Sequence, residues 1–351
     1  MTGRPHADPA GARERAIDAL RRAIYLLDRG LAPSQKVRAF ANAMDVIDGL
    51  GAQDLISRVQ DGSLTQLAGI GASTGSVISA AVTEEDPTYL ERLDADTACP
   101  PRTGAALREL LRGDLHCHST WSDGGATIRE MVDTAIALGH DHLAITDHSP
   151  RLTVAHGLSV QRLADQLVEI DRIRPEVAPF RILTGMEVDI LADGSLDLPD
   201  QALEQLDVVV ASVHSKLRMD PKDMTERMVR AVVSPHVDIL GHCTGRKIVG
   251  TGRPPSQFDA EVVFAACARF GTAVEINCRP ERRDPPPELL ELATEWDCLF
   301  AIDTDAHAPG QMEWQNWGCD LATDHSIGSE RIINTWSAED LLAWAGSHPI
   351  I

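Results

Sequence analysis

Imidazole and carboxylate side chains stand at or just beyond the ends of six apolar, strand-like segments in the C-terminal two-thirds of this chain. The segments are DLHCH, LAITDH, ILTGMEV, VVVASVH, VDILGH and LFAIDTDAH. In a barrel of parallel strands every carboxyl end opens on the same face, so side chains scattered along the sequence converge there. The candidate metal ligands, including one acid in the following WSDGG, are His116, His118, Asp123, His148, Glu187, His214, His242, Asp305 and His307. The pattern predicts a multi-metal site at one mouth of a parallel barrel.

The spacing within the segments supports this prediction. Side chains alternate along an extended strand, so His116 and His118 are expected to point the same way, and so are Asp305 and His307. Each pair could clamp one ion. Cys117 lies between two of these histidines and should face the opposite side of its strand, where we interpret it as a packing residue.

The donor types restrict the metal and its chemistry. Nitrogen and oxygen donors without thiolate suit Mn, Zn or Fe, and nine ligands exceed the needs of one ion, so two or three divalent ions are expected. Glu187 is the expected bridge, because a carboxylate has two oxygens to share. Clustered cations lower the pKa of a shared water, which would supply hydroxide for a hydrolytic attack. We expect Glu187, Asp305 and His148 to be the residues most directly involved in catalysis.

Composition excludes several classes of protein. The 351 residues carry a net charge of −21, which weighs against a general nucleic-acid coat. Residues 1–110 contain 12 basic and 15 acidic side chains, so −18 falls on the remainder. Seven cysteines without a CxxC pair favour a reducing cytoplasm over a disulfide framework. The sequence has no apolar run of transmembrane length and begins with a polar, Pro/Gly-rich stretch, so neither membrane association nor a signal peptide is expected.

The periodicity divides the chain into four parts. Residues 1–14 are expected to be a flexible tail and residues 15–93 a helical domain, since apolar residues recur at helical spacing. Residues 94–111, with a Pro-Pro pair, are expected to be a linker. Short apolar strands alternate with helical stretches over residues 112–351. This βα pattern predicts an α/β barrel of seven strands, the sixth of which, TAVEINC, supplies Asn277.

The motifs DLHCHSTWSDG, ITDHS, GMEVDI, ASVHS, ILGH and DTDAH together resemble the PHP (polymerase and histidinol phosphatase) family. The resemblance covers roughly residues 112–345. It implies a distorted seven-stranded, TIM-like barrel with a trinuclear metal site that hydrolyses phosphoesters. It also implies a metal-binding role for each of the nine residues named above.

A narrower resemblance is to the C-terminal PHP module of bacterial family X DNA polymerases, through TDHSPRLTVAHGLS, ILADGSLDLPD and DMTERMVRAV. The N-terminal region is similar to that family's helix-hairpin-helix domain, which implies that Gly69, Ile70 and Gly71 bind the DNA backbone through their amides. Ser73 and Val77 stand where that hairpin usually has lysines, so a Schiff-base lyase has no nucleophile there. No polymerase palm separates the two regions. The implied partners are a DNA end and a DNA repair or polymerase protein.

Four further residues are candidates for binding substrate. Lys216, Arg246 and Arg279 follow the fourth, fifth and sixth strands, so each is placed in a loop at the expected mouth, and Arg guanidinium suits phosphate. Arg282 and Arg283 are weaker candidates of the same kind. His156 stands where the polymerase-linked proteins usually have Asn, and it could contact substrate or cap a loop.

Three classes of function remain open from the sequence. A DNA-directed phosphodiesterase, either a 3′–5′ exonuclease or a repair-type nuclease, accounts for both the barrel and the hairpin domain. A small-molecule phosphomonoesterase resembling histidinol phosphatase would use the same metal site and suits the acidic surface. A non-catalytic repair scaffold is disfavoured because no ligand is missing. A more distant enzyme alternative is an amidohydrolase, which shares the HxH strand but often has a modified lysine where Glu187 stands.

Overall fold

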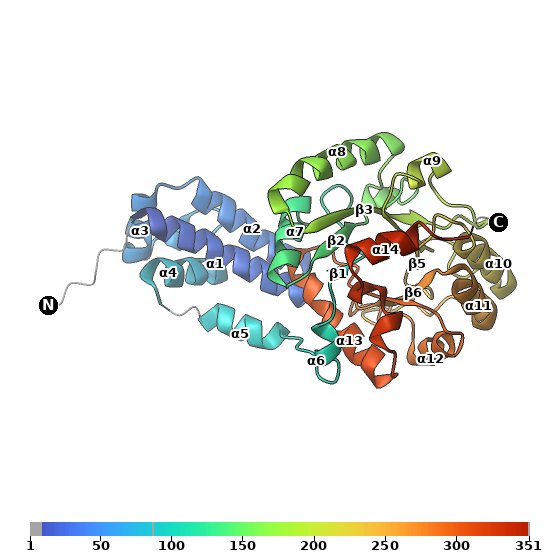
Figure 1. Cartoon of the computed structure of the whole chain (residues 1–351). Coiled ribbons are helices and arrows are strands. Elements are labelled where there is room, and N and C mark those ends of the chain that lie inside the picture. Colours follow the sequence, from blue (N-terminus) through green and yellow to red (C-terminus); the bar gives the residue numbers. More distant parts are fainter. Residues whose placement is uncertain (1–8, 86–87, 350–351) are drawn as a thin grey trace. The chain divides into compact units, whose positions relative to one another are not determined.

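The computed structural model describes residues 9–85 and 88–349, and the chain divides into two compact units, Met1–Ala98 and Cys99–Ile351 (Figure 1). The described part of the first unit is helical. The second unit contains a parallel sheet with helices around it. No helix within these described residues is both long enough and apolar enough to cross a membrane.

The first unit is built around its longest helix, which contacts the other four α-helices. Along this helix Ala12, Ala16, Leu20, Ala23 and Leu27 are buried at helical spacing, which gives it one continuous apolar face. The α-helices of this unit are α1 (Pro9–Arg29), α2 (Ser34–Asp48), α3 (Ala52–Asp61), α4 (Ala72–Thr83) and α5 (Thr88–Thr97).

A short turn joins α3 to α4 and includes a single 3-10 turn at Leu64–Gln66. Gly69 has a φ of 92°, a backbone conformation that favours glycine. Ile70 is buried, and its N–H donates to the carbonyl of Leu67. The N–H of Gly71 donates to the Thr74 hydroxyl at 2.9 Å. Two of the three amides expected to grip a DNA backbone are therefore already hydrogen-bonded within the turn.

Helix boundaries differ from the expected tail and linker. Residues 1–8 of the expected tail lie outside the described residues, but α1 already begins at Pro9 because Ala12 joins the apolar face. Residues 94–97, expected in the linker, form the end of α5. There Arg29 on α1 binds Asp94 and Thr97, which fixes the last turn of the helix. The expected linker also contains a short helix, α6 (Ala105–Arg108).

The second unit contains seven parallel strands in sequential order, which confirms the predicted α/β barrel. A parallel bridge between Cys117 and Ala306 links the segments that follow the first and last strands and brings the two sheet edges together. The strands are β1 (Gly113–Asp114), β2 (His142–Ile145), β3 (Arg181–Asp189), β4 (Val208–Ser212), β5 (Ile239–Leu240), β6 (Ala273–Asn277) and β7 (Phe300–Asp303).

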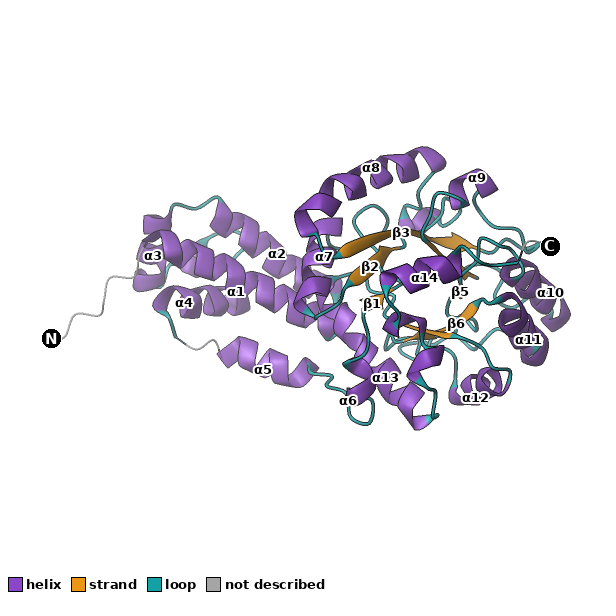
Figure 2. Ribbon diagram, viewed as in Figure 1, coloured by secondary structure: helices purple, strands orange, loops and turns teal. Residues whose placement is uncertain are grey.

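Helices cover the outside of these strands (Figure 2), as short βα and αβ connections require. The barrel helices are α7 (Ile128–Ala137), α8 (Val160–Val177), α9 (Asp200–Leu203), α10 (Pro221–Val232), α11 (Ala260–Phe270), α12 (Pro287–Glu295), α13 (Gln315–Asp324) and α14 (Ala338–Ala345). Between the strands and this layer lie buried residues such as Leu143 and Ile145 on β2 and Met131 and Val132 on α7. Capping side chains begin several helices, including Thr127 before α7 and Ser159 before α8.

Candidate metal centre

The carboxyl ends of the strands bring all nine predicted ligands together. Glu187 lies within β3, and its carboxylate is buried. The histidines expected to face it come from the segments after β1, β2, β4 and β5, which open on the same end of the barrel. Asp305 and His307 follow β7. Asp305 has a φ of 53°, a left-handed conformation that is uncommon for a residue with a side chain and is typical of functional sites.

Five imidazoles approach the two oxygens of Glu187. On Oε2, the nitrogens of His148, His116 and His118 lie at 2.8, 3.4 and 3.6 Å. On Oε1, those of His242 and His214 lie at 2.9 and 3.1 Å. A carboxylate that faces imidazoles through both oxygens has the arrangement of a bridging ligand.

The remaining predicted ligands flank this carboxylate. Asp123 Oδ1 lies 3.5 Å from His148 Nε2 and 3.4 Å from His307 Nε2. Asp305 Oδ1 lies 3.4 Å from His118 Nε2. As expected, Cys117 points elsewhere: its thiol donates to the carbonyl of Ala144 at 3.1 Å within an apolar cluster.

Seven of the nine residues form three overlapping groups, in each of which one ligand atom per residue lies within 4.8 Å of the others, and His242 and Asp305 lie beside these groups. The groups are His118–Asp123–His148–His307, His116–His118–Glu187 and His148–Glu187–His214. Several of their buried atoms, among them His116 Nε2, His118 Nε2, His214 Nε2 and Glu187 Oε2, have no hydrogen-bond partner in the protein. Buried polar atoms are rarely left in this state, so the set fits divalent cations bound between them.

The charges at the site favour the metal-binding protonation states of Glu187, Asp305 and His118. Burial alone would raise the pKa of Glu187, but His214 and His116 hold it well below its usual range. Burial would also raise the pKa of Asp305, and Arg282 instead holds it well below its usual value. Burial lowers the pKa of His118 far below its ordinary value, with His307 lowering it further. Ionised carboxylates and neutral imidazole are the forms that bind metals. Burial would also lower the pKa of His116 and of His214, but Glu275 raises the first well above its usual value and Glu187 raises the second to about 9, so these two rings must release a proton to bind a metal.

Two buried acids that we did not predict orient the histidines. Glu275, in the middle of β6, accepts from the His116 ring at 2.5 Å and also receives the backbone N–H of His242. Asp189 lies 3.5 Å from Nδ1 of His214 and accepts that residue's N–H. Carboxylates behind ligand histidines fix the ring orientation and the tautomer. An ionisable residue inside the apolar strand TAVEINC was the available signal for Glu275.

Of the predicted substrate-binding residues, one reaches the ligands directly. Arg279 donates to Nδ1 of His307 and to the Asp305 carbonyl, both at 2.9 Å. Arg282, which we rated lower, also reaches them, with its Nε 3.0 Å from Asp305 Oδ2. Burial had to be known to distinguish Arg282, whose side chain is only 14% exposed, from its exposed neighbour Arg283.

The other predicted substrate-binding residues lie differently. Arg246 donates to the backbone carbonyls of Arg282 and Arg283, so its guanidinium holds a loop. Lys216 is exposed, with a φ of 52°. His156 is also exposed and in the left-handed conformation; its carbonyl accepts from Arg162, which fits a loop-capping position.

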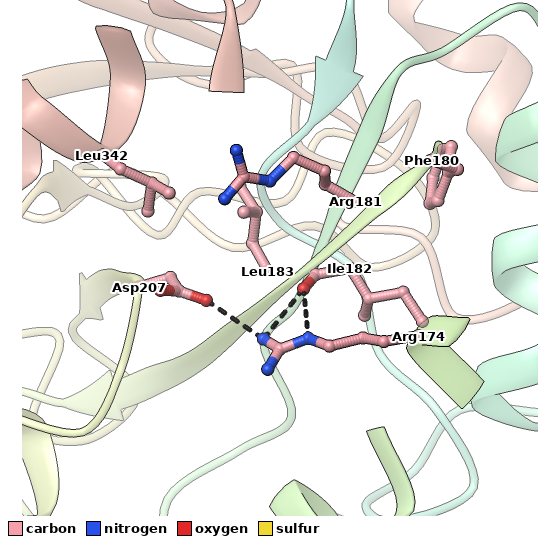
Figure 3. Close-up of a pocket in the computed structure, with 7 residues that line it drawn as sticks. All are labelled: Arg174, Phe180, Arg181, Ile182, Leu183, Asp207 and Leu342. Carbon is pink, nitrogen blue, oxygen red and sulfur yellow. Dashed lines mark hydrogen bonds and ion pairs between the residues drawn. The ribbon is translucent and has the colours of Figure 1, made fainter. Parts of the chain in front are cut away.

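A surface hollow of about 330 Å³ lies at the opposite end of the strands (Figure 3). It is lined by the residues that begin β3 and by Asp207, which precedes β4. There Arg174 donates to the carbonyl of Ile182 at 3.0 and 3.1 Å and lies 3.4 Å from Asp207. The polar groups of Arg174 and Asp207 therefore bind one another and the backbone, in contrast to those of the metal centre.

Residues 114–262 match the PHP domain family. The chain is 39% identical over 234 residues to the DNA polymerase/3′-5′ exonuclease PolX of Bacillus subtilis (strain 168), in an alignment that covers 67% of this chain and 41% of that protein. It therefore spans less than half the length of this relative. It is 32% identical over 237 residues to a probable phosphatase of Thermoanaerobacter sp. (strain X514), covering 63% of this chain and 89% of the relative.

Among solved structures, the crystal structure of histidinol phosphate phosphatase from Lactococcus lactis, complexed with zinc, L-histidinol and phosphate, aligns with a TM-score of 0.43 at 18% identity. The alignment covers 60% of this chain and 93% of that chain. The family match falls on the barrel that gathers the nine predicted ligands, and the alignment with a probable phosphatase covers 89% of that relative at 32% identity. This chain is therefore a member of the PHP family and a metal-dependent hydrolase of phosphoester bonds.

Proposed function

We propose that this protein is a DNA-directed phosphodiesterase, a 3′–5′ exonuclease or a repair-type nuclease, whose clustered donors would hold divalent ions that supply the hydroxide for hydrolysis. The observation that carries the hydrolytic part is the Glu187 carboxylate, which faces five imidazoles through both of its oxygens. The DNA-directed part is supported by the 39% identity over 234 residues to a relative named as a DNA polymerase/3′-5′ exonuclease. A second support is the pair of helices α3 and α4 joined by a short turn, which is compatible with a DNA-binding helix-hairpin-helix.

In this proposal the nine clustered residues hold two or three divalent ions, of Mn, Zn or Fe. Such ions supply Lewis acidity and an ionised water when bound. The protein's own part is to hold the donors in place. Glu187 would be shared between two neighbouring ions, and Asp305 and His148 would bind at either side of it. Arg279 and Arg282, close to Asp305, would attract the phosphoryl oxygens and orient them.

The hairpin at Gly69–Gly71 has a limited role in this proposal. Because the amides of Ile70 and Gly71 are hydrogen-bonded within the turn, a DNA phosphate would have to displace Thr74 to reach the second of them. No lysine follows the turn to compensate. We therefore assign most of the affinity for DNA to the barrel.

A small-molecule phosphomonoesterase is the second candidate. It is favoured by the alignment with the probable phosphatase, which covers 89% of that relative and 63% of this chain. Such an enzyme would use the same nine residues. The two candidates therefore differ in what the surface around the metal centre binds beyond a single phosphoryl group.

One experiment separates these candidates. A single-stranded oligonucleotide labelled at its 5′ end is incubated with Mn²⁺ and either wild type or Asp305→Ala, and the products are resolved on a denaturing gel. We expect a ladder that shortens from the 3′ end with wild type and an intact oligonucleotide with the variant. If the wild-type protein leaves the oligonucleotide intact but hydrolyses p-nitrophenyl phosphate, the phosphomonoesterase is favoured instead.

A further inference from the structure

We propose that two loops beside the metal centre form a binding surface for the phosphate backbone of a single-stranded nucleic acid next to the bond that is cut. This inference rests on the proposed function and assigns the residues that hold the strand. The surface, here called the basic patch, comprises residues from the loop after β5 and the loop after β6: Arg246, Lys247, Arg253, Arg279, Arg282 and Arg283.

The charge of the patch is opposite to that of the protein as a whole. In a chain with a net charge of −21, residues 244–258 contain three cations and no acid. The two acids in the second loop are engaged: Glu281 binds Arg279 at 2.8 Å, and the buried carboxylate of Asp284 accepts from Thr244. A local positive surface on an acidic protein attracts a polyanion to that one place and orients it there, because the acidic remainder of the surface repels it.

Hydrogen bonds tie the two loops together. Lys247 and Arg253 exchange backbone hydrogen bonds of 2.9 and 2.8 Å within the first loop. The N–H of Ile248 donates to the carbonyl of Glu281 in the second loop at 2.8 Å. The Arg246 side chain donates to backbone carbonyls of the second loop as well. The cations are therefore held close to one another by the backbone and do not depend on a surface ion pair.

Crowding of like charge is visible at Lys247. Partial burial lowers its pKa, and Arg282 lowers the pKa further. No acid lies within ion-pairing distance of the Lys247 or Arg283 side chains among the residues that the structure describes. Arg279 pairs with Glu281 and Arg282 with Asp305, so the cations left to bind an added anion are chiefly Lys247 and Arg283, and phosphate is an anion that guanidinium groups recognise well.

The patch is continuous with the metal centre. At one end, Arg282 and Arg279 contact Asp305 and His307. At the other, Lys247 and Arg283 are exposed. When one phosphodiester of a strand is held at the metal centre, the next phosphates of that strand would lie over Lys247 and Arg283. A substrate with a single phosphate would not reach these two residues.

Aromatic and apolar groups accompany these cations. The guanidinium of Arg283 lies 5.2 Å from the ring centre of Trp317, which holds its position without neutralising it. Ile248 and Val249, at the tip of the first loop, are 51% and 56% exposed. Cations beside such surfaces bind the backbone and bases of single strands, whose bases are free to make these contacts.

The test uses the full chain and the double variant Lys247→Gln/Arg283→Gln, neither residue of which contacts a proposed metal ligand. Three substrates are compared: an oligothymidylate of about 20 nucleotides, a thymidine dinucleotide with one phosphodiester, and bis-p-nitrophenyl phosphate. For the oligonucleotide we expect KM to rise about fivefold or more. We also expect the slope of log KM against log salt to fall by about 0.7 for each lost phosphate contact. For the two short substrates kcat/KM should not change.

A matched control removes the same charge elsewhere. Arg172 on α8 and Arg269 at the end of α11 are exposed, and Arg172→Gln/Arg269→Gln should leave all three substrates unaffected. The inference is overturned if the patch variant keeps the wild-type KM for the oligonucleotide. It is also overturned if the control variant weakens binding equally, since net charge alone would then explain the effect.

Failure of the proposed function has a different signature. In that case wild type hydrolyses p-nitrophenyl phosphate but leaves every oligonucleotide intact, and binding of a labelled oligothymidylate can be followed directly by fluorescence anisotropy. Binding that is weakened by the patch variant and not by the control would support the surface without the nuclease. Absence of binding would overturn both proposals.

Discussion

The two ends of the barrel use the same kind of residue in opposite ways. At the carboxyl ends of the strands, Glu187 faces imidazoles, and several buried donor atoms find no partner within the protein. At the amino ends, Asp207 accepts hydrogen bonds from the N–H and the hydroxyl of Thr184, each at 2.9 Å, and Asp238 accepts from the N–H of Val209. Carboxylates whose partners lie in the chain stabilise the fold. Carboxylates that need a partner from outside the chain, such as a metal ion, provide a binding site.

The largest effect is expected from Glu187→Gln. The amide keeps the shape of the side chain but cannot neutralise two cations, so bound metal should be lost. The rate of phosphoester hydrolysis should fall by about 10³-fold, equivalent to roughly 4 kcal/mol. Metal content by plasma mass spectrometry and kcat/KM for p-nitrophenyl phosphate check this, with thermal unfolding to show that the fold survives. Full metal content together with wild-type turnover would contradict the shared-ligand assignment.

Glu275→Gln tests whether the acid that contacts the ligand histidine His116 contributes to metal binding. Loss of the 2.5 Å contact should loosen the His116 ring and lower metal affinity by about 10- to 100-fold. When activity is measured against metal concentration, the concentration that gives half-maximal activity should be higher than for wild type, and saturating metal should restore most of the turnover. A purely structural role would instead lower stability without any such rescue.

At the opposite end, Asp207→Asn should affect stability and spare the chemistry. The amide leaves Arg174 without its charge partner and weakens the bonds to Thr184, at a cost of about 1–2 kcal/mol. For a unit of this size we expect Tm to fall by roughly 2–4 °C for each kcal/mol. Turnover and metal content should match wild type. A loss of bound metal in this variant would break the proposed division between the two ends.

The smallest effect is a pH dependence at the amino end. His348 Nε2 lies 2.9 Å from Asp238 Oδ1; burial alone would lower the pKa of His348, and Asp238 raises it above the ordinary 6.5. Stability from this pair is then fully present below pH about 6.5 and is lost as the pH rises through the folded-state value. Denaturant unfolding should show His348→Gln to be less stable than wild type by up to about 1 kcal/mol at pH 6, with a smaller gap at pH 9. An equal gap at both pH values would contradict this linkage.

The sequence was sufficient to predict the seven strands and the convergence of nine side chains, because a parallel barrel places every strand end on one face. It was insufficient for β1, which is only Gly113–Asp114 although DLHCH reads as one strand. Beyond Asp114, side chains replace the ladder: Asp303 accepts the N–H of Leu115, and Thr146 accepts that of Cys117. Local patterns do not report such long-range partners.

The supporting groups were also beyond reach of the sequence. Glu275 could be identified only once β6 was placed beside the segment that follows β5, and Arg282 only once burial distinguished it from Arg283. Motif positions specify the candidate ligands, whereas the residues that orient them depend on packing between strands that lie far apart in the sequence.

The overlap among the three donor groups has a consequence for how the centre would fill. His118, His148 and Glu187 each belong to two groups, but a neutral imidazole binds one ion, so of these three only the Glu187 carboxylate could be shared by ions in neighbouring positions. The first ion to arrive would fix a carboxylate that the next one also needs, and thus reduce the entropy lost by its successor. Loading and chelation should then be steep transitions in which the ions enter and leave together, and a half-filled centre would be a minor species.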